Sequence, residues 1–112
     1  MPGCIVRLTV SLAAPRGRAR DLRAAFRYIA VTTQSESGCV GCSVWTGPGS
    51  TLQYVEEWAT EDDVRRRIRS ERFTSLLSVI ESASKAPSVR FDFVTRRRGL
   101  EYVAEIRDHL VN

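Results

Sequence analysis

The chain has 112 residues, of which 43% are apolar and 27% charged, and its formal net charge is +4. This length suits one domain with a modest core, and the composition excludes a disordered or fibrous chain. No stretch approaches the roughly 20 apolar residues that a membrane-spanning helix requires, and no secretory signal pattern opens the sequence. We therefore expect one cytoplasmic domain over residues 1–112 and no membrane partner.

The first half of the chain alternates between strand and helix patterns. Apolar and polar residues alternate over residues 4–12, which predicts a strand with one buried face. Apolar residues then recur at helical spacing over 18–33, which predicts an amphipathic helix of about four turns. The patterns of residues 40–46 and 52–58 predict two further strands. The Gly-Pro-Gly-Ser turn at 47–50 joins them as a hairpin.

The second half repeats helix and strand once more. Thr60 is a predicted N-cap for a short helix ending at Ile68, and Ser70 is a predicted cap for the next helix. Alternation over 89–93 predicts a fourth strand, and a tail helix is expected over 99–110. The apolar stripes of the last two helices are Phe73, Leu76, Leu77 and Ile80, and Leu100, Val103, Ile106 and Leu110.

This order of elements, β-α-β-β-α-β plus a C-terminal helix, predicts an α+β domain of the ferredoxin-like kind, with an antiparallel sheet and helices on one face. Its core spans about residues 4–95, and the helical tail about 99–110. Both crossovers place their helices on the same side, so nothing in the chain covers the opposite face of the sheet. That face is either polar and wet or covered by a second chain.

The positive charge comes almost entirely from arginine. Runs at 65–67 and 96–98 can contact phosphates, but the acidic residues between 56 and 63 would repel a polyanion at the first run. The third strand also lacks the glycine and basic residue of an RNA-recognition motif. We therefore expect solvated surface charge and no nucleic-acid partner.

The cysteines do not form a disulfide framework, because Cys4, Cys39 and Cys42 are too few and odd in number. Cys39 and Cys42 have the spacing of a redox or metal pair. The motif leads into a strand, so their side chains are expected on opposite faces as small core residues. A metal would need two more ligands, and only Cys4 and His109 remain, so no metal is predicted.

Three short motifs, in this order, resemble the antibiotic-biosynthesis-monooxygenase family: ESGCVG at 36–41, YVEEWAT at 54–60 and SERF at 70–73. The resemblance implies a dimeric α/β barrel, and hence a homodimer. Some members of the family oxidise quinols or anthrone-like aromatics with dioxygen and without metal or organic cofactor. Other members degrade haem, and many have no established activity.

The chain departs from the active patterns of that family. Quinol-oxidising relatives carry a histidine six positions before the motif phenylalanine, and haem-degrading relatives carry a tryptophan there; this chain has Arg67. The haem-degrading relatives also have a histidine where this chain has Leu77 and an asparagine near Val10. Haem degradation is therefore not expected, and the missing histidine weakens the hypothesis of a quinol oxidase.

Glu56 is the candidate general base. It shares with Tyr54 and Trp58 the face of the third strand that should be buried, and a buried carboxylate needs a partner. The candidate partners are Arg67, Arg7 and Arg90. In catalysis Glu56 would deprotonate a phenol; otherwise it forms a structural ion pair or lies at a dimer rim.

Trp58 is the second predicted catalytic residue, because its ring can hold a flat aromatic substrate. The alternative is that Trp58 is a core aromatic. Tyr54, Arg67 and Phe73 complete the predicted substrate-binding set. The first hypothesis is a cofactor-independent monooxygenase acting on a small quinol or hydroxylated aromatic. The second is a non-catalytic dimeric module that binds a small ligand or a protein.

Overall fold

The computed structural model describes residues 5–83, 87–96 and 98–111 and has the predicted order of elements. Cys4 lies outside the described residues, as do the side chains of His109 and Leu110. The strands are β1 (Ile5–Ala13), β2 (Cys39–Thr46), β3 (Thr51–Trp58) and β4 (Ser88–Val94), and the helices are α1 (Ala19–Gln34), α2 (Glu61–Arg69), α3 (Arg72–Glu81) and α4 (Leu100–Val111).

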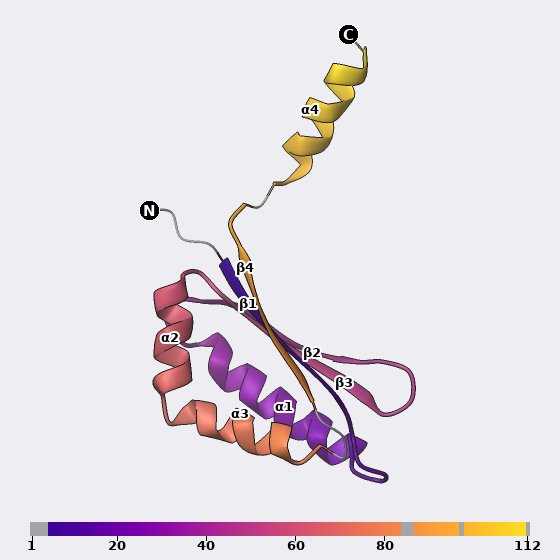
Figure 1. The fold of residues 1–112 in the computed structure, drawn as a ribbon, viewed down its shortest axis with the longest axis vertical. Coiled ribbons are helices and arrows are strands. Elements are labelled where there is room, and N and C mark those ends of the chain that lie inside the picture. Colours follow the sequence, from indigo (N-terminus) through magenta and orange to yellow (C-terminus); the bar gives the residue numbers. More distant parts are fainter. Residues whose placement is uncertain (1–4, 84–86, 97, 112) are drawn as a thin grey trace.

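The four strands form one sheet in the order β2-β3-β1-β4, and every neighbouring pair is antiparallel. Helices α1, α2 and α3 lie on one side of the sheet, while α4 extends away from the body of the domain (Figure 1). The ferredoxin-like arrangement predicted from the periodicity is thereby confirmed.

The core lies between this sheet and its helices. Tyr54 of β3 stacks on Phe26 of α1, with 5.2 Å between the ring centroids. The alternation predicted for β1 is confirmed, because Val6, Leu8 and Val10 are buried. The main cluster contains Leu8, Val10, Leu12, Ala14, Leu22, Phe26, Ile29, Ala30, Leu52, Tyr54, Phe73, Leu76 and Ile80.

The helix-free face of the sheet carries polar pairs at its centre. Arg7 of β1 and Glu57 of β3 form an ion pair, with 2.8 Å between Nη2 and Oε2. Gln53 donates to the hydroxyl of Ser11 at 3.4 Å. This face was expected to be either polar and solvated or covered by a second chain. At the centre of β1 and β3 it is polar.

The helix layer leaves β4 partly uncovered. Val89, Phe91 and Phe93 pair with Val10, Leu8 and Val6 of β1, so they point to the helix side of the sheet. They nevertheless stay 47%, 37% and 52% exposed, because β4 is the edge strand beyond α3. An apolar strip thus remains open to solvent at this edge.

A β-bulge in β2 corrects the prediction for its cysteines. Cys39 pairs with Trp58 and Gly41 with Glu57, so Val40 is an extra residue without a counterpart on β3. The bulge shifts the alternation by one residue. Cys39 and Cys42 therefore pack on the same, helix-covered side, whereas the prediction placed them on opposite faces. Val40 itself is exposed.

Two predictions for the second helical region differ from the structure. Thr60 caps α2 as predicted, accepting from the Asp63 amide at 3.1 Å. Ser70 does not cap α3: its hydroxyl donates to the Arg67 carbonyl and ends α2, and Glu71 takes the N-cap position of α3. Leu77, predicted as core, is 46% exposed because it lies on the side of α3 that faces the open edge at β4.

Candidate functional site

Glu56 is the centre of a buried polar network beneath the helices. Both of its oxygens accept hydrogen bonds from its own strand. Tyr54 Oη donates to Oε2 at 2.6 Å and Trp58 Nε1 donates to Oε1 at 2.9 Å. These contacts follow from the strand period, because residues two apart point to the same face. The carboxylate itself is 0% exposed.

Arg67 of α2 completes this network. Its Nη2 donates to Glu56 Oε2 at 2.8 Å and its Nε donates to Glu56 Oε1 at 3.2 Å, which makes a two-pronged ion pair. Nη1 reaches Glu36, after α1, at 3.5 Å. The guanidinium also lies over the ring of Phe73, 5.4 Å from its centroid. The charge of Glu56 is therefore compensated inside the protein, and Arg67 is the partner among the three candidates.

The network holds its titratable hydrogen-bond donors in their ordinary charge states. Burial, followed by the charge of Glu56, raises the pKa of the Tyr54 hydroxyl far above its ordinary value. Burial raises the pKa of the Cys42 thiol to about 12, and this thiol lies 3.2 Å from the Tyr54 oxygen. Burial alone would lower the pKa of Arg67, but the hydrogen bond and charge of Glu56 raise it overall. Tyr54, Cys42 and Arg67 therefore keep their ordinary charge states at neutral pH.

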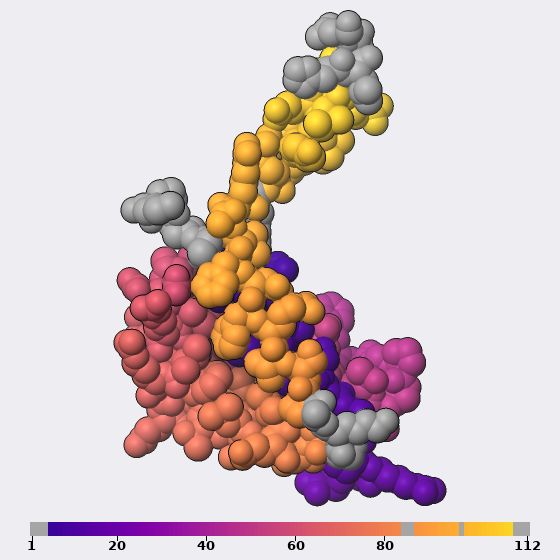
Figure 2. All heavy atoms as spheres, viewed as in Figure 1, coloured from indigo at the N-terminus to yellow at the C-terminus, as the bar shows by residue number. Residues whose placement is uncertain are grey.

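A separate apolar cleft opens between α3 and the β1–β4 edge of the sheet. Its volume is about 260 Å³. Figure 2 shows the side chains of β4, in orange, next to those of α3, in salmon, on the face where the cleft lies. Every residue that lines it is apolar: Leu8, Val10, Ile68, Phe73, Leu76, Leu77, Ile80, Val89 and Phe91.

The predicted site residues thus divide into two groups. Tyr54, Glu56, Trp58 and Arg67 come together in the buried network, and Trp58 packs with a small cluster that does not line the cleft. Phe73 belongs to both groups, because it contacts Arg67 and forms part of the cleft wall. The catalytic roles of Glu56 and Trp58, and the substrate-binding roles of the other three, stay predictions.

The cleft walls on β4 were not identified from the sequence. The alternation of Val89 and Phe91 predicts a strand, but periodicity does not say that the strand lies at the sheet edge, where its inner face remains open. Two of the departures from the family patterns, Val10 and Leu77, do meet in this cleft. The third, Arg67, is turned toward Glu56.

Among the described residues, no group of three or more His, Cys, Asp or Glu side chains is placed to hold a metal ion. None of the described helices has the length and apolar character needed to cross a membrane.

Solved structures resemble this chain closely in fold. An inferred antibiotic biosynthesis monooxygenase from Deinococcus radiodurans matches with a TM-score of 0.75 at 16% identity, over 85% of this chain and 97% of that chain. Another from Nitrosomonas europaea matches with a TM-score of 0.73 at 10% identity, over 88% and 98% of the two chains.

This chain has the antibiotic-biosynthesis-monooxygenase fold. A conserved protein from Methanosarcina mazei shares it too, with a TM-score of 0.73 at 18% identity, over 82% of this chain and 94% of that chain. Neither a protein-family model nor a curated protein matches the sequence. At these identities the likeness concerns the fold, so activity has to be argued from the site.

Proposed function

We propose that the protein binds a small aromatic molecule in the apolar cleft between α3 and β4 and promotes its oxygenation by dioxygen without a cofactor. The observation that carries the binding step is the lining of the cleft, where Phe73 and Phe91 lie among aliphatic side chains. Burying apolar surface contributes about 25 cal/mol per Å², and aromatic rings add stacking contacts. A volume of about 260 Å³ suits a ligand of a few fused or substituted rings.

The oxygenation step is supported by the fold that the chain shares with inferred antibiotic biosynthesis monooxygenases. The quinol itself supplies the two electrons that reduce the second oxygen atom of dioxygen to water. One oxygen atom of dioxygen enters a ring C–H bond, the other leaves as water with two hydrogens, and the quinol becomes a hydroxyquinone. An apolar cleft favours the encounter of the ring with apolar dioxygen.

The protein side chains in the cleft supply shape rather than acid–base chemistry. None of its lining residues titrates, so the phenolic proton would leave to solvent at the open side of the cleft. We assign substrate contact to Phe73 and a positioning role to the Glu56–Arg67 pair, which contacts that ring through the guanidinium. Direct catalysis by Glu56 would require Arg67 to release it first.

The second candidate function is ligand binding without catalysis. Both carboxylate oxygens of Glu56 already accept hydrogen bonds from Tyr54, Trp58 and Arg67. This favours binding without catalysis, because Glu56 is then not free to act as a general base. In this case the cleft would bind an aromatic molecule and release it unchanged.

Oxygen uptake with a panel of quinols and anthrones distinguishes the two functions. Metal-free protein that consumes one dioxygen per quinol, with hydroxyquinone as product, supports the monooxygenase. Saturable binding of the same compounds without oxygen uptake supports the binding module. If Glu56→Gln lowers turnover while binding stays intact, Glu56 participates in the reaction; unchanged turnover removes it from the mechanism.

We also propose that the protein is a cytoplasmic homodimer that forms through the apolar surface of β4 and α4. Phe93 on β4 and Leu100, Val103 and Ile106 on α4 are all exposed, and exposed apolar surface of this kind is characteristic of association sites. Sedimentation of Ile106→Glu, beside the wild type, tests the proposal. A shift toward monomer is expected, whereas a wild-type chain that is monomeric at high concentration would contradict it.

A further inference from the structure

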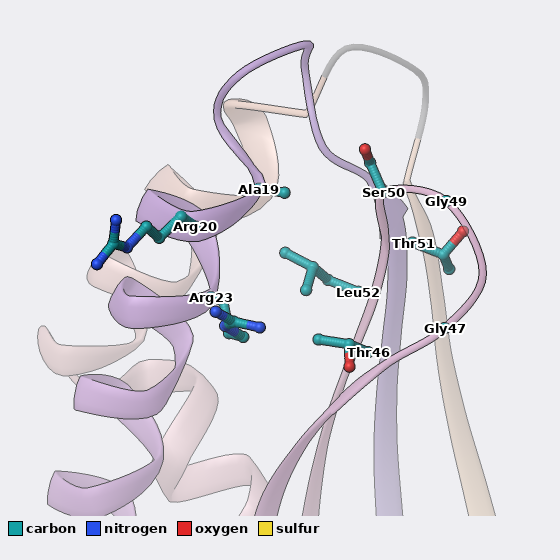
Figure 3. A pocket seen from close by; sticks show the side chains of 9 residues that line it. All are labelled: Ala19, Arg20, Arg23, Thr46, Gly47, Gly49, Ser50, Thr51 and Leu52. Atoms are coloured by element: carbon teal, nitrogen blue, oxygen red, sulfur yellow. The ribbon is translucent and has the colours of Figure 1, made fainter.

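A second hollow lies at the opposite edge of the sheet from the apolar cleft. It is enclosed by the first turns of α1 and by the β2–β3 hairpin (Figure 3) and has a volume of about 410 Å³. The strand order is β2-β3-β1-β4, and this hollow and the cleft at β4 have no lining residue in common. Its main lining residues are Arg20, Arg23, Thr46, Ser50, Thr51 and Leu52.

The hollow carries positive charge that none of the described residues neutralises through an ion pair. Arg20 and Arg23 are three residues apart on α1, and both residues line the hollow. Neither forms an ion pair within the described residues, and no acidic residue lines the hollow. The one acid in the first turn, Asp21, is 3.8 Å from Arg18 instead.

The two arginines take different positions in the hollow. In Figure 3, Arg23 extends from α1 toward Leu52 and Thr46, whereas the side chain of Arg20 extends away from the hairpin. Arg23 is half-buried and Arg20 exposed. Arg23 is therefore placed to contact a group held inside, while Arg20 adds positive charge nearby without reaching into the hollow.

The hairpin supplies uncommitted hydroxyl groups. Thr46, Ser50 and Thr51 use backbone groups to close the turn and its neighbours, as in the bond from the Gly47 amide to the Thr51 carbonyl at 2.9 Å. None of their three hydroxyls makes a hydrogen bond within the described part of the chain. The side chain of Thr51 points away from α1 (Figure 3), because Thr51 shares its strand parity with Gln53 on the helix-free face, which leaves Thr46 and Ser50. Small hydroxyl side chains beside arginine are suited to the several acceptor oxygens of a phosphate group.

We propose that this hollow binds a small organic phosphomonoester, with its phosphate group against Arg23 and the hydroxyls of Thr46 and Ser50. The Arg23 guanidinium can pair with phosphate through two parallel hydrogen bonds, and Arg20 adds a second positive charge nearby. The hollow exceeds the size of a lone phosphate, and the apolar side chains of Ala19 and Leu52 can contact the organic part. The site differs from a phosphate-binding loop, because the hairpin leads into β3 and is not followed by a helix with a lysine.

Calorimetric titration of the full chain with phenyl phosphate tests the proposal. Saturable one-to-one binding is expected, about tenfold weaker or more in Arg23→Gln and less strongly weakened in Arg20→Gln. Arg27→Gln is the matched control, because Arg27 is exposed on the same helix, carries the same charge and does not line the hollow. Its affinity should stay within about twofold of the wild type.

Three results would overturn the proposal. The first is the absence of saturable binding by the wild type. The second is an equal loss in Arg27→Gln and Arg23→Gln, which would reduce the effect to general surface charge. The third is a short oligonucleotide that binds more tightly than phenyl phosphate. Inorganic phosphate that binds as tightly as the ester would overturn the part played by Ala19 and Leu52. None of these results depends on the apolar cleft.

Discussion

Arg67 and Glu56 form a two-pronged ion pair in which neither side chain is more than 1% exposed, with 2.8 Å between Nη2 and Oε2. Removing one partner leaves an uncompensated charge in the core, which typically costs about 3–5 kcal/mol. We expect Arg67→Ala to lower the free energy of unfolding by about that amount, measured by urea denaturation.

Arg65→Ala is the control for this loss. Arg65 lies on the same helix and pairs with Glu61 at 3.0 Å, but both side chains are exposed. Exposed pairs contribute about 1 kcal/mol or less, so this variant should unfold nearly like the wild type. Replacing both buried partners, as in Glu56→Leu with Arg67→Met, should recover much of the loss. Equal effects of Arg65→Ala and Arg67→Ala would contradict the structural assignment.

Gly38 should tolerate substitution much less well than Gly49. Both have positive φ, +86° and +66°, but a Cβ at Gly38 would lie 2.2 Å from Cγ of Asp63, while none of the atoms around Gly49 comes within 4 Å. Left-handed backbone alone costs a non-glycine residue about 1–2 kcal/mol. Gly49→Ala should lose about that much stability, and Gly38→Ala distinctly more. Thermal unfolding of the two variants compares them, and indistinguishable midpoints would be inconsistent with the close approach of Asp63.

Cys42 should be an unreactive thiol in the folded protein. Burial raises its pKa to about 12 from 9.0, so little thiolate exists at mildly alkaline pH. We expect modification by a coloured disulfide reagent to be at least about a hundredfold slower than in the denatured chain. Mass mapping of the labelled cysteines measures this rate; rapid labelling of Cys42 under native conditions would show that the thiol is accessible and ionised.

The same shift makes a prediction for alkaline stability. The unfolded chain releases the Cys42 proton near pH 9.0, while the folded chain keeps it to about pH 12. The contribution of the neutral thiol to stability is therefore complete below pH 9 and declines as pH rises from 9 toward 12. Cys42→Ala should flatten part of this decline. A decline of the same steepness in Cys42→Ala would assign the loss to other groups.

If the protein oxidises quinols, the pH dependence of turnover should follow the substrate. The cleft is lined by residues that do not titrate, so the deprotonated fraction of the quinol sets the rate. The inflection in the pH–rate profile should move with the phenolic pKa across a series of substituted quinols. A fixed inflection, independent of the substrate, would indicate that a protein group acts as the base.

Sequence reasoning predicted the fold and three of the four residues that meet in the network, for definable reasons. Alternation placed Tyr54, Glu56 and Trp58 on one buried face, since strand parity is a local property. It left Arg67, Arg7 and Arg90 open as partners of Glu56. The structure pairs Arg7 with Glu57 and Arg90 with Asp92, which leaves Arg67.

The features that escaped prediction depend on tertiary placement. The bulge at Val40 changes strand parity without a sequence signal as clear as proline, and it brought Cys39 and Cys42 to one face. The open cleft depends on β4 lying at the sheet edge, which follows from strand order rather than from the residues of β4. Leu77 was predicted to be in the core because helical spacing identifies an apolar helix face. It does not show whether that face packs on the sheet or lies beside an open sheet edge.

The most direct test of the central claim is a methyl NMR titration of the full chain with 2-naphthol as the aromatic probe. Ring currents from a bound ligand should shift the methyl signals of Leu77, Ile80 and Val89 together, with one saturation curve, because all three line the cleft. Val31, exposed on α1 away from the cleft, should not move. Leu77→Glu should weaken binding several-fold, with Val31→Glu as the control for adding a surface charge. Shifts that do not saturate, or that are equal at Val31 and Leu77, would contradict an aromatic-binding cleft.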